Sequence, residues 1–407
     1  MYLMSKLSRC LLLCLLFSCA HVSSAAAQFS ILHQFDSSSV DAAQPRSTLV
    51  VQGNEIYGTT AFGGSNNLGT IFKFDTNGSN LQLLHEFSGS DGSNSLSGPI
   101  LVGSQLYGTT LQGGSNNDGT IYRIDTDGTN LETLHSFDGG AGGRLGQAQP
   151  TFANGVLYGA TRAGGASGNG AVYTMNLDGT GFSVLHDLTD PQGVLPNEVV
   201  VDGSSIYSGT VSGGPANGGE IFSVGTDGTG FQSLKSLTPG GPDGSFVSAS
   251  PILVGSTLYG TTVFGGEDGG GLIYQVETDG TGFEVLHDFE NSTMSSSRGA
   301  STRLIASGSS FFGMTAQGGA SDNGVVFSIG QDGSDFTVLH EFSGIEGTGT
   351  GRLTLDGQTL YGTRQFGGEF GGGTLFALSV PEPSANILFL FALLIGSIFR
   401  RRDPHLA

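Results

Sequence analysis

The chain has 407 residues, of which 70 are Gly and none is Trp, and only 12% are charged. Glycine at this density without a three-residue period excludes collagen, and with 37% hydrophobic residues the chain need not be disordered. Residues 28–379 carry 33 acidic and 10 basic residues, hence a net charge of −23. Such a surface repels nucleic acid and anionic lipid, so we expect no nucleic-acid partner.

Residues 1–27 predict a secretory signal peptide. Lys6 and Arg9 precede the apolar run 10–17, and small residues end at Ala27, after which we expect cleavage. The segment ending at Cys19 resembles a lipoprotein cleavage box, so lipidation there is an alternative. All cysteines of the chain lie inside this signal, namely Cys10, Cys14 and Cys19. The mature chain therefore has no disulfides and depends on a large core.

A unit of about 50 residues then recurs seven times, which is the period of a repeat architecture. Each copy has an aromatic residue followed directly by Gly, or by Ser in the fourth copy; we call this the aromatic-Gly step. A pair of adjacent glycines follows it a few residues later. The aromatic residues are Tyr57, Tyr107, Tyr158, Tyr207, Tyr259, Phe312 and Tyr361. In the second unit the expected strands are 99–102, 105–110, 119–125 and 131–137. Four antiparallel strands per unit are typical of propeller blades.

The two ends of the repeat region predict a closed ring. A fourth strand of the Leu-His-x-Phe type occurs seven times, and its first copy, 29–35, precedes any complete unit. The last unit stops at its third strand, 373–379. We therefore predict an all-β, seven-bladed β-propeller over 28–379, closed by the N-terminal strand. An open β-solenoid or two separate sheets are the alternatives.

In the second unit, the residues of the repeat motif are 106–110, 113–114, 119–122 and 127–129. These residues resemble the bacterial Gloeo_Verruco (GloVer) tandem repeat, and the resemblance extends over about 29–379. Proteins with this repeat often end in PEP-CTERM-like signals. The resemblance implies an extracellular location and no known activity.

Residues 380–407 predict a sorting or anchor segment. The motif Pro381, Glu382 and Pro383 is followed by the apolar stretch 387–399, which we expect to form a short hydrophobic helix. This stretch is shorter than the about 20 residues of a usual membrane span. Three arginines follow, Arg400, Arg401 and Arg402. They would stay on the cytoplasmic side and leave the propeller outside.

This order of motif, apolar stretch and basic end resembles the PEP-CTERM sorting signal. The resemblance implies an exosortase-type membrane protease as a partner, which would cut near the motif and transfer the protein to the surface. A plain C-terminal anchor without processing is the alternative, so the tail is either cleaved or retained.

The fourth strands centre on His33, His85, His135, His186, Lys235, His287 and His340. Strand alternation puts these residues with the apolar set, one in each blade, where they cannot converge on one metal. We interpret them as core histidines that form hydrogen bonds within or between blades, and we expect no metal site. The sequence 125–129 resembles part of a calcium loop but is explained by a hairpin turn. Weak Ca²⁺ binding by the acidic surface is the one cofactor left open.

No catalytic motif stands out, so no catalytic residue is assigned. Antiparallel order places the loops between second and third strands on the same face as the blade-to-blade loops, such as 188–197 and 238–250. Variable polar loops on a rigid scaffold are where binding usually occurs. The candidate ligand-binding residues are Asn67, Asn117, Asp118, Asp268 and Asn323. Stacking surfaces for sugars are offered by Phe62, Phe264 and Phe366, and the competing interpretation is solvated turn residues.

These features predict an exported cell-surface or extracellular-matrix protein, anchored transiently or permanently in the membrane by its C-terminal segment. We expect its propeller to be a non-enzymatic binding or structural module that contacts extracellular polysaccharide or a surface protein. The alternative is a secreted propeller enzyme, a polysaccharide lyase or hydrolase, which rests on fold analogy.

Overall fold

The computed structural model describes residues 27–37, 42–146, 148–247, 249–290, 298–300 and 302–380. Residues 29–378 form one compact unit. The predicted signal peptide lies outside the described residues except for Ala27. The sorting motif, the three arginines and the expected C-terminal helix, all within 381–407, lie outside them as well. In the part of the chain that is described, no helix has the length and apolarity to cross a membrane.

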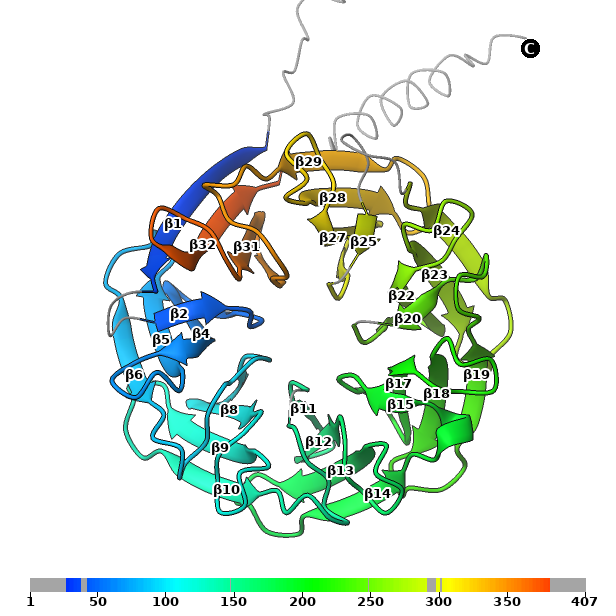
Figure 1. Ribbon diagram of the computed structural model, residues 1–407, viewed down its shortest axis with the longest axis horizontal. Coiled ribbons are helices and arrows are strands. Elements are labelled where there is room, and N and C mark those ends of the chain that lie inside the picture. Colours follow the sequence, from blue (N-terminus) through cyan, green and yellow to red (C-terminus); the bar gives the residue numbers. More distant parts are fainter. Residues whose placement is uncertain are drawn as a thin grey trace, which may run out of the picture. The chain divides into compact units, whose positions relative to one another are not determined.

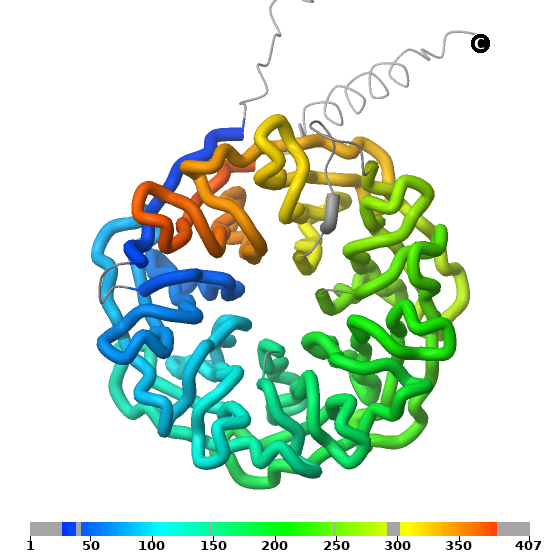
Figure 2. Tube along the Cα trace, in the orientation of Figure 1, coloured from blue at the N-terminus to red at the C-terminus, as the bar shows by residue number. Residues whose placement is uncertain are grey.

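Seven antiparallel sheets stand in a ring, which confirms the seven-bladed, all-β propeller (Figure 1). We call the region at the centre of the ring, between the innermost strands, the channel. The tube view shows the repeats following one another around the ring in chain order (Figure 2). The first blade contains β2 (Ala42–Pro45), β3 (Val50–Gln52), β4 (Glu55–Gly63), β5 (Thr70–Asp75) and β6 (Gln82–Glu86). The second contains β7 (Ile100–Val102), β8 (Gln105–Thr110), β9 (Thr120–Asp125) and β10 (Glu132–Ser136).

The later blades repeat this arrangement. The third contains β11 (Thr151–Ala153), β12 (Val156–Thr161), β13 (Ala171–Asn176) and β14 (Ser183–Asp187). After the 3-10 turn η1 (Asp190–Gln192), the fourth contains β15 (Val194–Pro196), β16 (Val200–Asp202), β17 (Ser205–Ser212), β18 (Glu220–Gly225) and β19 (Gln232–Ser236). The fifth contains β20 (Ser245–Val247), β21 (Ile252–Val254), β22 (Thr257–Phe264), β23 (Leu272–Glu277) and β24 (Glu284–Asp288).

The sixth blade contains β25 (Arg298–Ala300), β26 (Ile305–Ser307), β27 (Ser310–Gln317), β28 (Val325–Gly330) and β29 (Thr337–Glu341). The seventh contains β30 (Leu353–Asp356), β31 (Thr359–Arg364) and β32 (Gly371–Ser379), and β1 (Gln28–Asp36) lies beside β32 at the outer edge of this sheet (Figure 1). The four strands expected in the second unit correspond to β7, β8, β9 and β10, with bounds that agree to within a residue at each end.

The blade-to-blade segments differ from the expected loops. In four blades a further short strand (β2, β15, β20 or β25) pairs with the far end of the long second strand. The prediction of loop throughout 188–197 and 238–250 was therefore wrong at Val194–Pro196 and Ser245–Val247. The physical reason is that the second strand continues past its first partner, and its exposed edge leaves backbone groups that the incoming chain satisfies.

In most blades a glycine of the second strand lies opposite an aromatic residue of the third strand, so that the aromatic ring can lie over the backbone of the second strand. Gly58 lies opposite Phe72, and Gly108 lies opposite Tyr122. A Cβ placed on Gly58 would lie 2.5 Å from Cζ of Phe72 and 2.8 Å from a methyl carbon of Leu49. The same pairing recurs in six blades, and in the fourth blade Ser208 faces Phe222 instead. The rings thereby fill the space that the missing side chains leave.

The fourth-strand histidines join neighbouring blades at the outer rim. The ring of His135 stacks on Phe182 of the next blade at 3.7 Å, and that of His287 stacks on Phe336 at 4.0 Å. Burial lowers the pKa of both histidines, which favours the neutral ring. Lys235 takes the same place in the fourth blade, with its ammonium 4.6 Å from the centre of the Phe283 ring. The structure thus gives these residues the structural role that the sequence suggested.

Hydrogen bonds near the channel also join the blades. The Thr59 hydroxyl donates to the Ser95 carbonyl at 3.1 Å, and the Thr109 hydroxyl donates to the Ala148 carbonyl at 3.0 Å. Between the seventh and first blades, the Thr354 hydroxyl donates to the Leu49 carbonyl at 2.7 Å. Neighbouring blades are therefore joined at their outer edges by ring stacking and at their inner edges by hydrogen bonds.

The substitution Gly58→Ala should destabilise the propeller by about 1–3 kcal/mol, because the new methyl group overlaps the Phe72 ring inside a packed core. Chemical denaturation of both proteins measures the difference. The control is Gly140→Ala, where the nearest atom to a new Cβ is 3.6 Å away. Equal unfolding midpoints for the Gly58 variant and the wild type would contradict the proposed packing.

Candidate functional site

The central channel is lined by residues that precede the innermost strand of each blade. This position lies one or two residues before that strand, and four of its seven occupants (Thr48, Gln149, Arg303 and Arg352) line the two cavities described below. The residues at this position are Thr48, Gly98, Gln149, Glu198, Ser250, Arg303 and Arg352. They differ from blade to blade, whereas the position that follows them is apolar in every blade.

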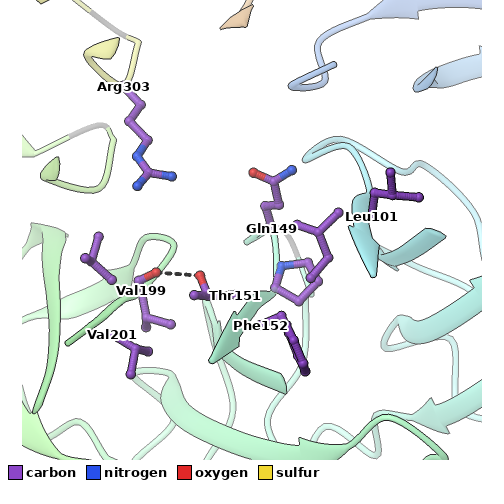
Figure 3. Close-up of a pocket in the computed structure, with 10 residues that line it drawn as sticks. Leu101, Gln149, Thr151, Phe152, Val199, Val201 and Arg303 are labelled. Atoms are coloured by element: carbon purple, nitrogen blue, oxygen red, sulfur yellow. Dashed lines mark hydrogen bonds between the residues drawn. The ribbon is translucent and has the colours of Figure 1, made fainter. Parts of the chain in front are cut away.

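Two cavities open in this channel and share Gln149 and Arg303. The smaller, of about 280 Å³, is also lined by Thr48 and Arg352, so that residues from distant blades meet there. The larger, of about 390 Å³, extends along the innermost strands to Thr151 and Phe152. Figure 3 shows the Arg303 guanidinium and the Gln149 amide pointing into the same space from the sixth and third blades.

Hydrogen bonds hold the wall of the larger cavity in place. The Thr151 hydroxyl donates to the Val199 carbonyl at 2.6 Å, which joins the third blade to the fourth (Figure 3). The Gln149 amide donates to the Pro99 carbonyl at 2.8 Å, which joins the third blade to the second. The Phe152 side chain is 42% exposed and presents a free ring surface at this cavity. Thr151 and Phe152 are thus positioned by β11, and Gln149 lies two residues before this strand.

An ion pair crosses the channel. Arg352 of the seventh blade donates to the Glu198 carboxylate of the fourth blade, three blades away around the ring. The Glu198 side chain is only 4% exposed. Burial alone would raise the pKa of Glu198, but the charges of Arg352 and Arg303 hold that pKa below its ordinary value. Glu198 is therefore ionised at neutral pH.

Four arginines lie in this part of the ring: Arg352, Arg303 and Arg162 interact electrostatically with Glu198, and Arg46 interacts with Arg352 and Arg162. They are Arg46, Arg162, Arg303 and Arg352, from the first, third, sixth and seventh blades. Burial lowers the pKa of Arg46, and the charges of Arg352 and Arg162 lower it further. Burial also lowers the pKa of Arg303, where the charge of Glu198 opposes the shift and that of Arg352 adds to it. Burial and Arg352 lower the pKa of Arg162 too, while Glu198 opposes them. These shifts leave guanidinium groups protonated at neutral pH. We call these five residues the channel charge cluster.

The loop residues chosen from sequence lie elsewhere. Asn67 and Asn117 adopt left-handed backbone conformations, with φ of 54° and 62°, and each side-chain oxygen accepts a hydrogen bond from a Gly amide at 3.0 Å. They help to form the hairpin between the second and third strands. Asp118, Asp268 and Asn323 lie in the equivalent hairpins of the second, fifth and sixth blades. None of the five residues lines either cavity described above, and the structure does not bring them together.

The remaining sequence candidates are also spread around the ring. Phe62, Phe264 and Phe366 are exposed, but they belong to the first, fifth and seventh blades. The carboxylate of Asp127 accepts the amide and the hydroxyl of Thr129 at 2.9 and 2.7 Å, as in a self-contained hairpin turn. Among the described residues, no three His, Cys, Asp or Glu side chains are grouped to hold a metal ion.

The channel charge cluster was missed from the sequence, although a signal for it exists. Three of the 10 basic residues of the propeller, Arg46, Arg303 and Arg352, stand shortly before the first strand of their unit. When the units are aligned on the aromatic-Gly step, Arg303, Arg352 and Glu198 fall at one position. The shared position is hard to recognise in the unaligned sequence, because the loops before it vary in length from blade to blade.

The fold is similar to that of several solved structures. An oligogalacturonate lyase in complex with manganese shares 13% identity over 88% of this chain and 97% of that chain, with a TM-score of 0.54. An oligogalacturonate lyase from Vibrio parahaemolyticus shares 13% identity over 88% of this chain and 98% of its own, also with a TM-score of 0.54. A puromycin-hydrolyzing peptidase from Mycobacterium tuberculosis shares 14% identity over 79% and 48% of the two chains, with a TM-score of 0.52. At these identities the likeness shows the fold alone.

No curated protein matches the sequence. The family described as the Gloeobacter/Verrucomicrobia repeat matches residues 18–212 and again residues 196–401. The two matches together extend over nearly all of the chain and include every blade. The resemblance that the repeat motif showed to this family is therefore confirmed, and the chain belongs to the Gloeobacter/Verrucomicrobia repeat family.

Proposed function

We propose that this protein is an exported cell-surface or extracellular-matrix protein whose propeller binds extracellular polysaccharide without cleaving it. The observation that carries this proposal is the pair of cavities in the channel, which share Gln149 and Arg303. Amide, hydroxyl and guanidinium groups form hydrogen bonds with sugar hydroxyls, and an exposed ring such as Phe152 stacks on a sugar face.

The rigidity of the site also supports a binding role. Its side chains stand on or next to innermost strands that are hydrogen-bonded to neighbouring blades. A preformed site loses little conformational freedom when a ligand binds, which favours affinity. The polar loop residues Asn67, Asn117, Asp118, Asp268 and Asn323 would provide a second, outer surface for a long polysaccharide or a surface protein.

Export and sorting rest on the two ends of the chain. The signal 1–27 would be removed, and the segment 380–407 would be handled by an exosortase-type protease that reads Pro381, Glu382 and Pro383. Support comes from the position of β1, which begins at Gln28, the first residue of the mature chain in this proposal.

The N-terminal strand would then close the ring by completing the seventh blade. The strand order β1-β32-β31-β30 supports this role. Phe29 adds a contact to the preceding blade, because its ring stacks on His340 at 3.8 Å. In this arrangement export produces the chain end that closes the propeller.

A secreted polysaccharide lyase or hydrolase is the second candidate. It is favoured by the Glu198 carboxylate among arginines in the channel, and two structures of similar fold carry the name oligogalacturonate lyase. Because that likeness shows only the fold, product formation must be measured directly.

The full chain, purified in detergent, should bind its source organism's extracellular polysaccharide saturably and release no shortened or unsaturated product. Biolayer interferometry measures the binding, and chromatography with ultraviolet detection of the same samples measures product. Parallel samples with Ca²⁺ and with chelator test the acidic surface. Product release would replace the binding role with the enzyme, and absence of both binding and product would reject the polysaccharide as the partner.

Replacing Glu382 by Ala in the source organism should leave the protein uncut and in the membrane fraction, because the sorting protease no longer reads its motif. Immunoblots of membrane and surface fractions measure the size and location of the protein. The control is Glu267→Ala, at an exposed hairpin residue of the fifth blade. If the Glu382 variant is processed like the control, the sorting proposal fails.

A further inference from the structure

The channel charge cluster concentrates positive charge in an otherwise acidic propeller. Four of the 10 basic residues of 28–379 belong to it, and Glu198 is its single carboxylate. Its formal charge is therefore +3 (four arginines and one glutamate), whereas the region 28–379 as a whole carries −23. Like charges in a partly buried site repel each other and are costly without a counter-charge.

The bonds within the cluster do not neutralise it. Glu198 pairs with Arg352, and its other carboxylate oxygen, Oε2, is buried with no hydrogen-bond partner among the described residues. Arg303 lines both cavities, and its pKa is lowered by burial and by Arg352, while the charge of Glu198 opposes this shift. Arg303 thus brings one positive charge of the cluster to the place where the cavities are open.

We propose that the channel binds an oxyanion-bearing sugar unit, so that the ligand is an acidic polysaccharide with Arg303 as its main contact. This inference rests on the proposed function and names the class of ligand. A guanidinium group presents paired N–H donors that match the two oxygens of a carboxylate or the oxygens of a sulfate ester. The bound oxyanion would supply the counter-charge that the cluster lacks.

The other side chains at the cavity favour a sugar acid over a small free anion. The exposed Phe152 ring and the Gln149 amide share the 390 Å³ cavity with Arg303. An aromatic face packs against the C–H face of a sugar ring, and an amide forms hydrogen bonds with ring hydroxyls. A free inorganic anion would not use the aromatic face.

The charge of the whole propeller makes a distinct prediction about salt. The acidic surface repels a polyanion over long distances, and about 0.15 M salt screens charges separated by more than about 8 Å. The contacts in the channel are shorter and partly buried, so they are screened less. We therefore expect binding to strengthen from low to moderate salt and to weaken again at high salt.

The test compares polygalacturonate (carboxylate), dextran sulfate (sulfate) and neutral dextran, each immobilised for biolayer interferometry with the full chain in detergent. The wild type should bind at least one of the two polyanions at least about tenfold more tightly than dextran. Arg303→Gln should lose at least about tenfold in affinity for that polyanion, and Arg303→Lys should lose less. Arg123→Gln is the matched control, because it removes the same charge from a rim residue paired with Glu132.

Thermal unfolding distinguishes loss of contact from loss of fold. Arg303→Gln should keep a Tm close to that of the wild type, because the lost attraction to Glu198 and the lost repulsion from Arg352 oppose each other. Arg352→Gln should lower Tm, because it leaves the buried Glu198 without its partner. Unchanged polyanion binding by Arg303→Gln would overturn the inference.

The polysaccharides also separate this inference from the proposed function. Dextran bound as tightly as both polyanions would overturn the inference and leave the polysaccharide-binding role standing. Binding of none of these polysaccharides, or of the organism's own, would overturn both. Preference between polygalacturonate and dextran sulfate identifies the oxyanion, and either preference supports the inference.

Discussion

The close approach of the second and third strands in each blade is the constraint on which the propeller depends. A glycine such as Gly58 leaves room for an aromatic ring such as Phe72, so the ring lies over the backbone of its neighbour. The blade gains a large buried apolar surface without becoming thicker. Seven such blades fit around one centre, and the fourth blade, with Ser208 opposite Phe222, shows that a small side chain is tolerated there.

The rigid ring separates structural positions from variable ones. Core aromatic residues and the histidine–aromatic stacks repeat from blade to blade, whereas the channel positions change from Thr48 to Gln149 to Arg303. Because the backbone of every blade is already fixed by its own core and its neighbours, the residue type at the channel positions can vary. They are free to determine what the channel binds, and the arginines concentrated around Glu198 are the clearest case.

Most of the fold follows from local sequence signals. The repeat period, the aromatic-Gly step and the Asp-Gly turns predicted the blades, and strands such as β8 were located to the residue. The short strands β15 and β20 were missed, because pairing along the edge of a neighbouring strand leaves no periodicity of its own. The channel charge cluster was missed for a related reason. Its members lie far apart in the chain, and only ring closure brings Arg352 to Glu198.

The most direct test of the account is a crystal structure of the protein with a short oligomer of galacturonic acid. The account predicts electron density in the channel, with a carboxylate of the ligand against the Arg303 guanidinium and a sugar ring over Phe152. Density confined to the hairpins around Asn117 or Asp268, with the channel empty, would contradict it.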